Sequence, residues 1–173
     1  GKVTMTFLPP KRARRAFDAR EGQCVFIASD KTLTRHPERH ALLPSTAITD
    51  SAIYFFAADA EGTISRIEEV MHKRLAIENG TRNTLANELP AVADMETMIT
   101  EDPFQAFELL QHGRVDVVAA FIEDAVAYSK NVGIPLFSFD PELPLVQVEE
   151  GLLCWKSPET ELFIHGVDKQ IED

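Results

Sequence analysis

The stretch ELLQHGRVDVVAAF, residues 108–121, combines the end of a helix, a glycine stop and a buried strand. Just before it, Asp102 and Pro103 are the residue types preferred at a helix N-cap and at the first helical position. Apolar residues then recur at helical spacing, at Phe104, Phe107 and Leu110. Gly113 supplies the left-handed residue that commonly follows a helix, and the apolar run 115–121 is typical of a strand covered on both faces. The stretch therefore predicts a helix and a buried strand of an α/β sheet.

Strand-like and helix-like segments alternate along the rest of the chain. Short β-rich or apolar runs predict strands at 2–8, 23–29, 51–58, 75–77, 96–100, 115–121, 135–139 and within 144–156. Helical spacing and capping residues predict helices at 11–21, 64–74, 84–89, 103–112, 122–133 and 159–172. Gly22 is expected to end the first helix, and the polar segment 30–46 is expected to be a loop with about one helical turn. This alternation predicts an α/β protein with mainly parallel sheets.

The length, net charge and hydropathy of the chain limit the classes of binding partner that we expect. The 173 residues are enough for about one domain or two small lobes. The net charge of −11 argues against nucleic acid or an anionic membrane as a partner, because both attract surfaces rich in Lys and Arg. No apolar run reaches the roughly 18 residues that a membrane-spanning helix needs. An acidic surplus is otherwise typical of a solvated surface.

The two cysteines, Cys24 and Cys154, lie far apart in apolar, strand-like runs. Their spacing is not that of a metal site. One disulfide and two buried free thiols are both consistent with these positions. The sequence contains no P-loop, no G-x-G-x-x-G and no nucleophile-elbow motif, so it predicts neither a cofactor nor a metal.

Three short segments carry candidate ligand-binding groups. His36, Arg39 and their basic neighbours form either a clamp for an anion or a solvated charged loop. Residues 79–83 form either a turn whose free amides attract an anion or an ordinary junction between a strand and a helix. Glu123 follows the strand 115–121, where ligands bind in open α/β sheets, although an acid there also caps a helix.

Read in order, three blocks make the chain resemble the type 2 periplasmic solute-binding proteins, which capture amino acids and related polar solutes. PPKRARRAFDAREGQCVFIAS (9–29) resembles the family's Pro-x-x-Arg helix, glycine turn and first-lobe strand. TRHPER (34–39) resembles its Thr-Pro-Glu-Arg loop, and AFELLQHGRVDVVAAF (106–121) resembles its helix, Gly-Arg-Val-Asp turn and strand. The resemblance implies a two-lobe α/β fold with mainly parallel sheets, two hinge crossings and a ligand between the lobes.

The resemblance also implies which residues hold a ligand. Arg39 matches the arginine that pairs with a ligand carboxylate, and Thr34 lies in the loop before it. Gly80 and Thr81 match the second-lobe turn whose amides meet the same carboxylate, and Arg82 follows them.

A further pair of implied site residues lies at the last residue of the predicted strand 115–121 and just beyond it. In amino-acid binders, an acid at this point takes the ligand's ammonium group. Here the position falls at Phe121, with Glu123 two residues later. This departure from the family pattern argues against an α-amino-acid ligand.

The resemblance places lobe 1 at about 1–60 plus 145–173 and lobe 2 at about 61–144. Segment 2–8 looks like the second strand of the family fold. The strand and helix that normally come first are therefore expected to be missing. Lobe 1 is then incomplete, or another segment takes their place.

The function that follows is a non-enzymatic, extracytoplasmic binding module for a small polar ligand that carries a carboxylate. Its expected location is the periplasm, although this chain shows no signal peptide. Its expected partners are an ABC transporter in the membrane or a sensor kinase. One alternative is an enzyme of dehydratase or lytic type on the same scaffold, with Glu123 and a histidine as the minimal acid–base pair. Another is the cytoplasmic effector domain of a transcription regulator.

Overall fold

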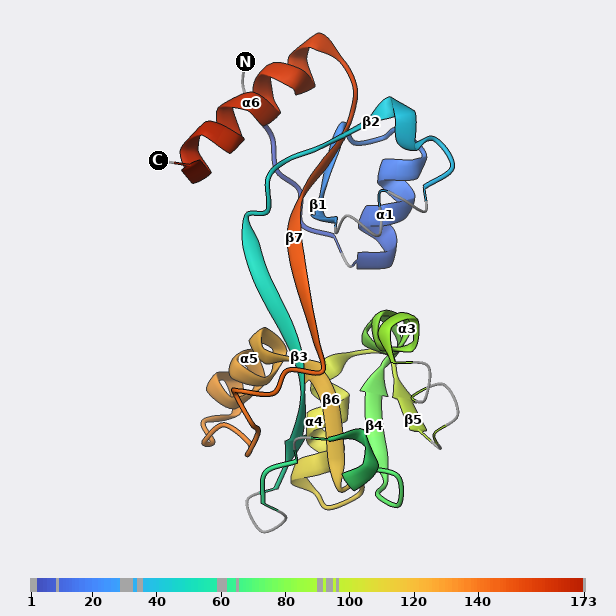
Figure 1. Ribbon diagram of the computed structural model, residues 1–173, viewed down its shortest axis with the longest axis vertical. Helices are drawn as coiled ribbons and strands as arrows, with labels where there is room; N and C mark the ends of the chain where they lie inside the picture. The colour runs from blue at the N-terminus through green and yellow to red at the C-terminus, as the bar shows by residue number, and fades with distance from the viewer. Residues whose placement is uncertain are drawn as a thin grey trace. The chain divides into compact units, whose positions relative to one another are not determined.

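The computed structural model, drawn in Figure 1, describes residues 3–8, 10–28, 33, 36–58, 62–64, 66–89, 92, 95 and 97–172. Contacts divide the chain into unit 1, residues 1–50 with 148–173, and unit 2, residues 51–147. The chain passes between the units twice, within strand β3 (Thr49–Ala57) and within strand β7 (Val146–Trp155). The predicted α/β class with two crossings is confirmed.

The division between the units differs from the predicted lobe boundaries. The first crossing falls after Asp50, whereas the sequence suggested residue 60. The reason is that most of β3 belongs to the sheet of unit 2, where Ile53 lies opposite Phe121 and Ala57 opposite Val117. A strand that runs through both units cannot be assigned to either one from its own residues.

Unit 1 is built around the second half of β7. Its other elements are helix α1 (Pro10–Asp18), strand β1 (Cys24–Ala28), the 3-10 helix η1 (Arg39–Ala41), strand β2 (Leu42–Pro44) and helix α6 (Pro158–Glu172). Strands β1 and β2 both pair antiparallel with β7. Phe17, Leu42, Leu153 and Trp155 form its buried core.

One disulfide joins two neighbouring strands of this sheet. Cys24 on β1 lies opposite Cys154 on β7, and the two sulfurs are bonded. Of the two arrangements that the sequence left open for its cysteines, the structure has the disulfide.

Unit 2 contains the parallel strands. Its elements after β3 are the 3-10 helix η3 (Ile67–Glu69), β4 (Leu75–Glu78), α3 (Asn79–Glu88), β5 (Thr97–Thr100), α4 (Pro103–Gln111), β6 (Val117–Phe121) and α5 (Ile122–Val132). The strand order is β3-β6-β4-β5, and β4 pairs parallel with both β5 and β6. Parallel pairing is thus found in unit 2, whereas β3, which enters from unit 1, pairs antiparallel with β6.

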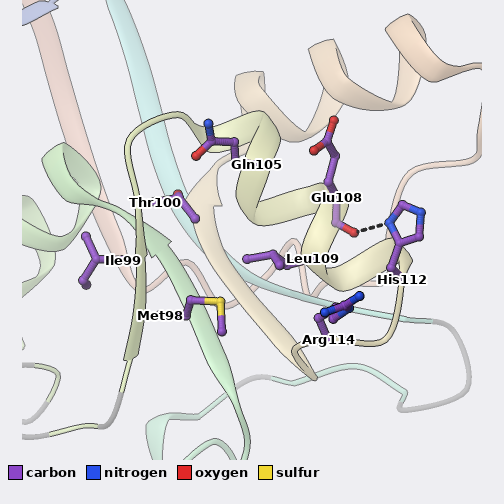
Figure 2. Close-up of a pocket in the computed structure, with 8 residues that line it drawn as sticks. All are labelled: Met98, Ile99, Thr100, Gln105, Glu108, Leu109, His112 and Arg114. Atoms are coloured by element: carbon purple, nitrogen blue, oxygen red, sulfur yellow. Dashed lines mark hydrogen bonds between the residues drawn. The ribbon is translucent and has the colours of Figure 1, made fainter.

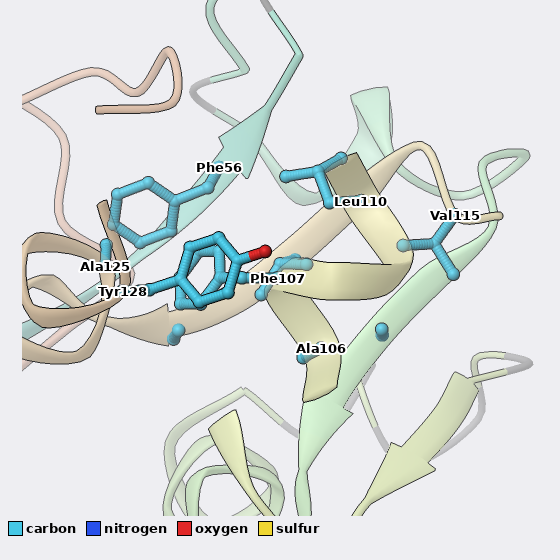
Figure 3. Packing of buried hydrophobic residues seen from close by; sticks show 10 residues of the cluster. Phe56, Ala106, Phe107, Leu110, Val115, Ala125 and Tyr128 are labelled. Atoms are coloured by element: carbon cyan, nitrogen blue, oxygen red, sulfur yellow. The ribbon is translucent and has the colours of Figure 1, made fainter. Parts of the chain in front are cut away.

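Helices α4 and α5 cover one face of the unit 2 sheet. Their side chains pack around Phe107, which is completely buried between Phe56 and Tyr128 (Figure 3). The predicted start of α4 is confirmed, because the Asp102 side chain accepts a hydrogen bond of 2.7 Å from the Phe104 amide. The predicted end is confirmed too, since Gly113 has a φ of +63°.

The strand predicted at 2–8 is wrong over its described part. Residues 3–8 have no regular secondary structure, and Val3, Met5 and Phe7 are 63%, 74% and 88% exposed. Alternation of apolar residues predicts a strand only if a neighbouring strand accepts its main-chain hydrogen bonds. The described residues offer 3–8 no such neighbour.

The helix predicted at 64–74 is also wrong, because the described residues of this segment form only the short 3-10 helix η3. Ile64 and Val70 are buried, but Met71 is 55% exposed. A single amphipathic segment of this length is marginal as an isolated helix and depends on a surface to cover.

Three smaller predictions also need correction. Helix α1 ends at Asp18, and the left-handed residue after it is Arg20, with a φ of +58°, not Gly22. The segment 135–139 contributes only an isolated bridge between Ser138 and Ala57. Strand β2 lies where a loop was predicted, because its register with β7 comes from tertiary pairing.

Candidate functional site

The carboxyl ends of β4 and β6 lie side by side in unit 2. Ile77 is in register with Ala119 across this parallel pair. The chain then leaves β4 directly into α3 and leaves β6 directly into α5. Four of the predicted ligand-binding residues lie in the first turns of these two helices, and a fifth, Phe121, is the last residue of β6. All five therefore lie at the carboxyl end of the sheet.

The turn that begins α3 already holds a carboxylate. Glu78 is the N-cap residue, and its Oε2 accepts a hydrogen bond of 2.8 Å from the Thr81 amide and one of 3.3 Å from the Thr81 hydroxyl. A Cβ at Gly80 would lie 2.8 Å from the same oxygen. The glycine thus leaves room for a carboxylate against the amides that start the helix, where anions are favoured.

The turn that begins α5 presents a second carboxylate. Phe121 is its half-buried N-cap residue, and Glu123 in the first turn is exposed. The Ser51 hydroxyl, which is 7% exposed on β3, donates a hydrogen bond of 2.7 Å to Glu123 Oε2. Ser51 therefore fixes one oxygen of Glu123.

Two buried polar atoms near this carboxyl end of the sheet have no hydrogen-bond partner among the described residues. They are Nε of Arg82, in the first turn of α3, and Oγ1 of Thr100, which lies in register with Glu78. An unsatisfied buried group costs about 1–3 kcal/mol. Native proteins usually resolve such a cost with water or a ligand.

The remaining predicted residues belong to unit 1. Arg39 begins η1 with an exposed side chain, and its amide donates to the His36 carbonyl at 3.2 Å. His36 is only 9% exposed, and its ring packs edge-on against Trp155 with 5.7 Å between centroids. The ring accepts a 3.1 Å hydrogen bond from the Glu38 amide, which fixes the chain just before Arg39. Thr34 lies outside the described residues.

Sequence reasoning missed Glu78 and Ser51. A signal for Glu78 was present, because an acid at the junction of a strand and a helix suits the positive end of the helix. Ser51 had no such signal, because it reaches Glu123 only through the pairing of β3 with β6. Among the described residues, no cluster of three or more His, Cys, Asp or Glu side chains could hold a metal, and no helix could cross a bilayer.

The chain has the two-lobe fold of the periplasmic binding proteins. It is similar to a solved substrate-binding protein of an amino acid ABC transporter, with a TM-score of 0.67 and 20% identity over 99% of this chain and 73% of that one. It is also similar to a histidine kinase sensor domain that itself resembles periplasmic binding proteins, with a TM-score of 0.64 and 13% identity over 91% and 71%.

A third similar structure is an ancestral amino-acid-binding protein described as a precursor of cyclohexadienyl dehydratase. The TM-score is 0.67, with 14% identity over 98% of this chain and 71% of that one. At these identities the likeness establishes the fold alone. No protein-family model and no curated protein sequence matches the chain.

Proposed function

We propose that the chain is the binding module of an extracytoplasmic solute-binding protein or sensor, and that it takes up a small polar solute bearing a carboxylate. The proposal rests on the carboxyl ends of β4 and β6, where the five predicted residues Gly80, Thr81, Arg82, Phe121 and Glu123 lie. The fold is shared with binding proteins. Arg39 of unit 1 is the proposed partner of the ligand carboxylate. An ABC transporter or a sensor kinase is the proposed downstream partner, and the periplasm is the proposed location.

The Glu78 carboxylate makes the proposed binding mode more specific, because it lies where a ligand carboxylate is expected. It shows that the start of α3 accepts a carboxylate, but it also occupies the Thr81 amide that a ligand would use. A ligand carboxylate must therefore displace Glu78 from that amide against the repulsion of two like charges. Glu78→Gln, which keeps the size and removes the charge, should strengthen the binding of a carboxylate ligand. A carboxylate that binds the variant more weakly would mean that it does not use this turn.

Thermal melting with amino acids and small carboxylates tests the function. A true ligand at 100 times its Kd should add about 2.7 kcal/mol to the free energy of unfolding. Arg39→Ala should remove the stabilisation by a carboxylate ligand and leave the melting temperature without ligand unchanged. Arg14→Ala, which removes another exposed arginine of unit 1, is the matched control. Equal stabilisation of both variants would exclude Arg39 from the site.

The enzyme alternative rests on the dehydratase precursor among the similar structures. It needs Glu123 to act with a histidine as an acid–base pair. In the structure the hydrogen-bond partner of Glu123 is the Ser51 hydroxyl instead. We therefore propose binding as the function and keep catalysis as the alternative.

A further inference from the structure

A groove on unit 2 lies between strand β5 and helix α4. It has a volume of about 450 Å³. Met98 and Ile99 of β5 and Leu109 of α4 line its apolar part, and His112 and Arg114 line one end (Figure 2). Thr100, named above beside Glu78, also lines the groove, but none of the five residues of unit 2 that we propose to bind the solute does.

Strand β5 is the last strand in the order of the unit 2 sheet, so one side of its backbone faces no neighbouring strand among the described residues. Its sequence, Thr-Met-Ile-Thr, contains none of the charged residues or prolines that usually protect such edges. Met98 and Ile99 are 48% and 43% exposed. Figure 2 shows that they point to opposite sides of the strand, as alternating residues do. The edge therefore offers both main-chain groups and apolar side chains to an added strand.

One end of the groove carries the guanidinium of Arg114, and Glu108 is also among the residues that line the groove. Arg114 follows the glycine turn after α4, and no ion pair of its guanidinium is found within the described part of the chain. His112 is held in place because its Nδ1 donates a 2.7 Å hydrogen bond to the Glu108 carbonyl. Figure 2 shows the Glu108 carboxylate pointing away from Leu109 and Arg114. In a chain with a net charge of −11, this end of the groove is complementary to an acidic group.

We propose that the groove binds an extended, acidic peptide segment of a partner protein. The segment adds to the free edge of β5 through main-chain hydrogen bonds, as in known cases of strand addition. An apolar side chain packs on Met98 and Leu109, and an acidic side chain pairs with Arg114. A second copy of the chain is a poorer occupant, because two molecules of net charge −11 repel each other.

Fluorescence anisotropy with labelled peptides tests the proposal on the full chain. The probe is a short acetylated peptide of alternating Thr and Val with one Glu near its end, and a second peptide carries Lys in place of Glu. The Glu peptide should bind saturably and the Lys peptide at least about tenfold more weakly. Arg114→Glu should reverse this preference. A third peptide with Pro at its centre should bind poorly, because Pro cannot donate to a strand.

Met98→Lys should weaken binding of the Glu peptide by at least about tenfold, since a charge on the edge blocks strand addition. Met71→Lys makes the same change at a methionine of unit 2 that is 55% exposed and outside the groove, and it should bind normally. Circular dichroism confirms that both variants fold.

Three results would overturn the proposal. They are no saturable binding of any peptide, equal binding by the two methionine variants, and equal binding of the Glu and Lys peptides. A dimer seen by sedimentation and lost in Met98→Lys would instead assign the groove to a second copy.

Discussion

Arg20 shows how tertiary contacts hold a residue in an unfavourable backbone conformation. Its φ of +58° completes the end of α1, where the Arg20 amide donates to the Phe17 carbonyl and the Glu21 amide to the Ala16 carbonyl. A left-handed conformation costs a non-glycine residue about 1–2 kcal/mol. The guanidinium offsets part of this cost, because it lies 4.1 Å from the ring centroid of Trp155 and 3.1 Å from Glu38.

Two substitutions of Arg20 distinguish the free-energy cost of its backbone conformation from the stabilisation by its side-chain contacts. Arg20→Ala loses the contacts and keeps the strain, so it should be destabilised by about 1 kcal/mol. Arg20→Gly also loses the contacts but relieves the strain, so it should exceed Arg20→Ala in stability by about 1 kcal/mol. Urea unfolding of the two variants measures the difference. Equal midpoints would show that the conformation at residue 20 costs little.

At the scale of elements, helix α4 is anchored by Phe107. The ring lies 5.5 Å from that of Phe56, 5.4 Å from that of Tyr128 and 5.7 Å from that of Phe137. Phe107→Ala should lower the free energy of unfolding by about 3–5 kcal/mol, because it leaves a cavity in the core. Phe7→Ala is the control, since Phe7 is 88% exposed and its loss should be nearly neutral. Chemical denaturation followed by circular dichroism compares them.

An ion pair joins the starts of β4 and β6. The Arg74 guanidinium contacts both oxygens of Asp116, at 2.6 and 3.1 Å, and the Arg74 amide donates to Asp116 at 2.8 Å. These hydrogen bonds, the side-chain ones first, lower the pKa of Asp116 from its ordinary 3.8 to about 2. The pair lies at the opposite end of these strands from the proposed ligand site, so its role is structural.

The pKa shift predicts how stability depends on pH. Because the pKa of Asp116 is lower in the folded state, its stabilising contribution is present above about pH 4 and is lost as the pH falls toward about 2. Asp116→Asn should therefore be less stable than the parent at neutral pH. The difference between them should shrink below about pH 4. Urea unfolding midpoints of both proteins, measured across this pH range, test the prediction. A difference in stability that stays constant with pH would contradict the lowered pKa of Asp116.

At the scale of the whole molecule, the disulfide and the aromatic residues distinguish the two units. Cys24 and Cys154 both belong to unit 1, and so does Trp155, the single tryptophan. Both tyrosines, Tyr54 and Tyr128, belong to unit 2. Each unit therefore has its own spectroscopic probe.

Reduction of the disulfide should destabilise unit 1 selectively. A disulfide typically contributes about 2–4 kcal/mol by restricting the unfolded chain. With reductant, the transition followed by tryptophan fluorescence should move to lower urea concentration, while that followed by tyrosine signals moves less. Cys24→Ser should reproduce the effect without reductant. Equal shifts of both signals would show that the units unfold as one.

Local signals in the sequence predicted α4, its glycine stop and β6, because N-cap chemistry, helical spacing and a left-handed glycine all act within a few residues. The same kind of signal predicted a turn over 79–83 and a helix over 84–89, whereas helix α3 begins at Asn79 and includes Gly80. The resemblance to solute-binding proteins then supplied the two-lobe arrangement, and the similar solved structures support it by fold.

The amino-acid sequence by itself determined the α/β class, both ends of α4 and the end of α5 at Gly133. Only the tertiary structure decided that segment 3–8 is not a strand, that Cys24 bonds to Cys154, and that Ser51 donates a hydrogen bond to Glu123. The physical reason is that caps and turns are stabilised by neighbours along the chain. Strands, disulfides and cross-strand hydrogen bonds need partners that only folding brings close.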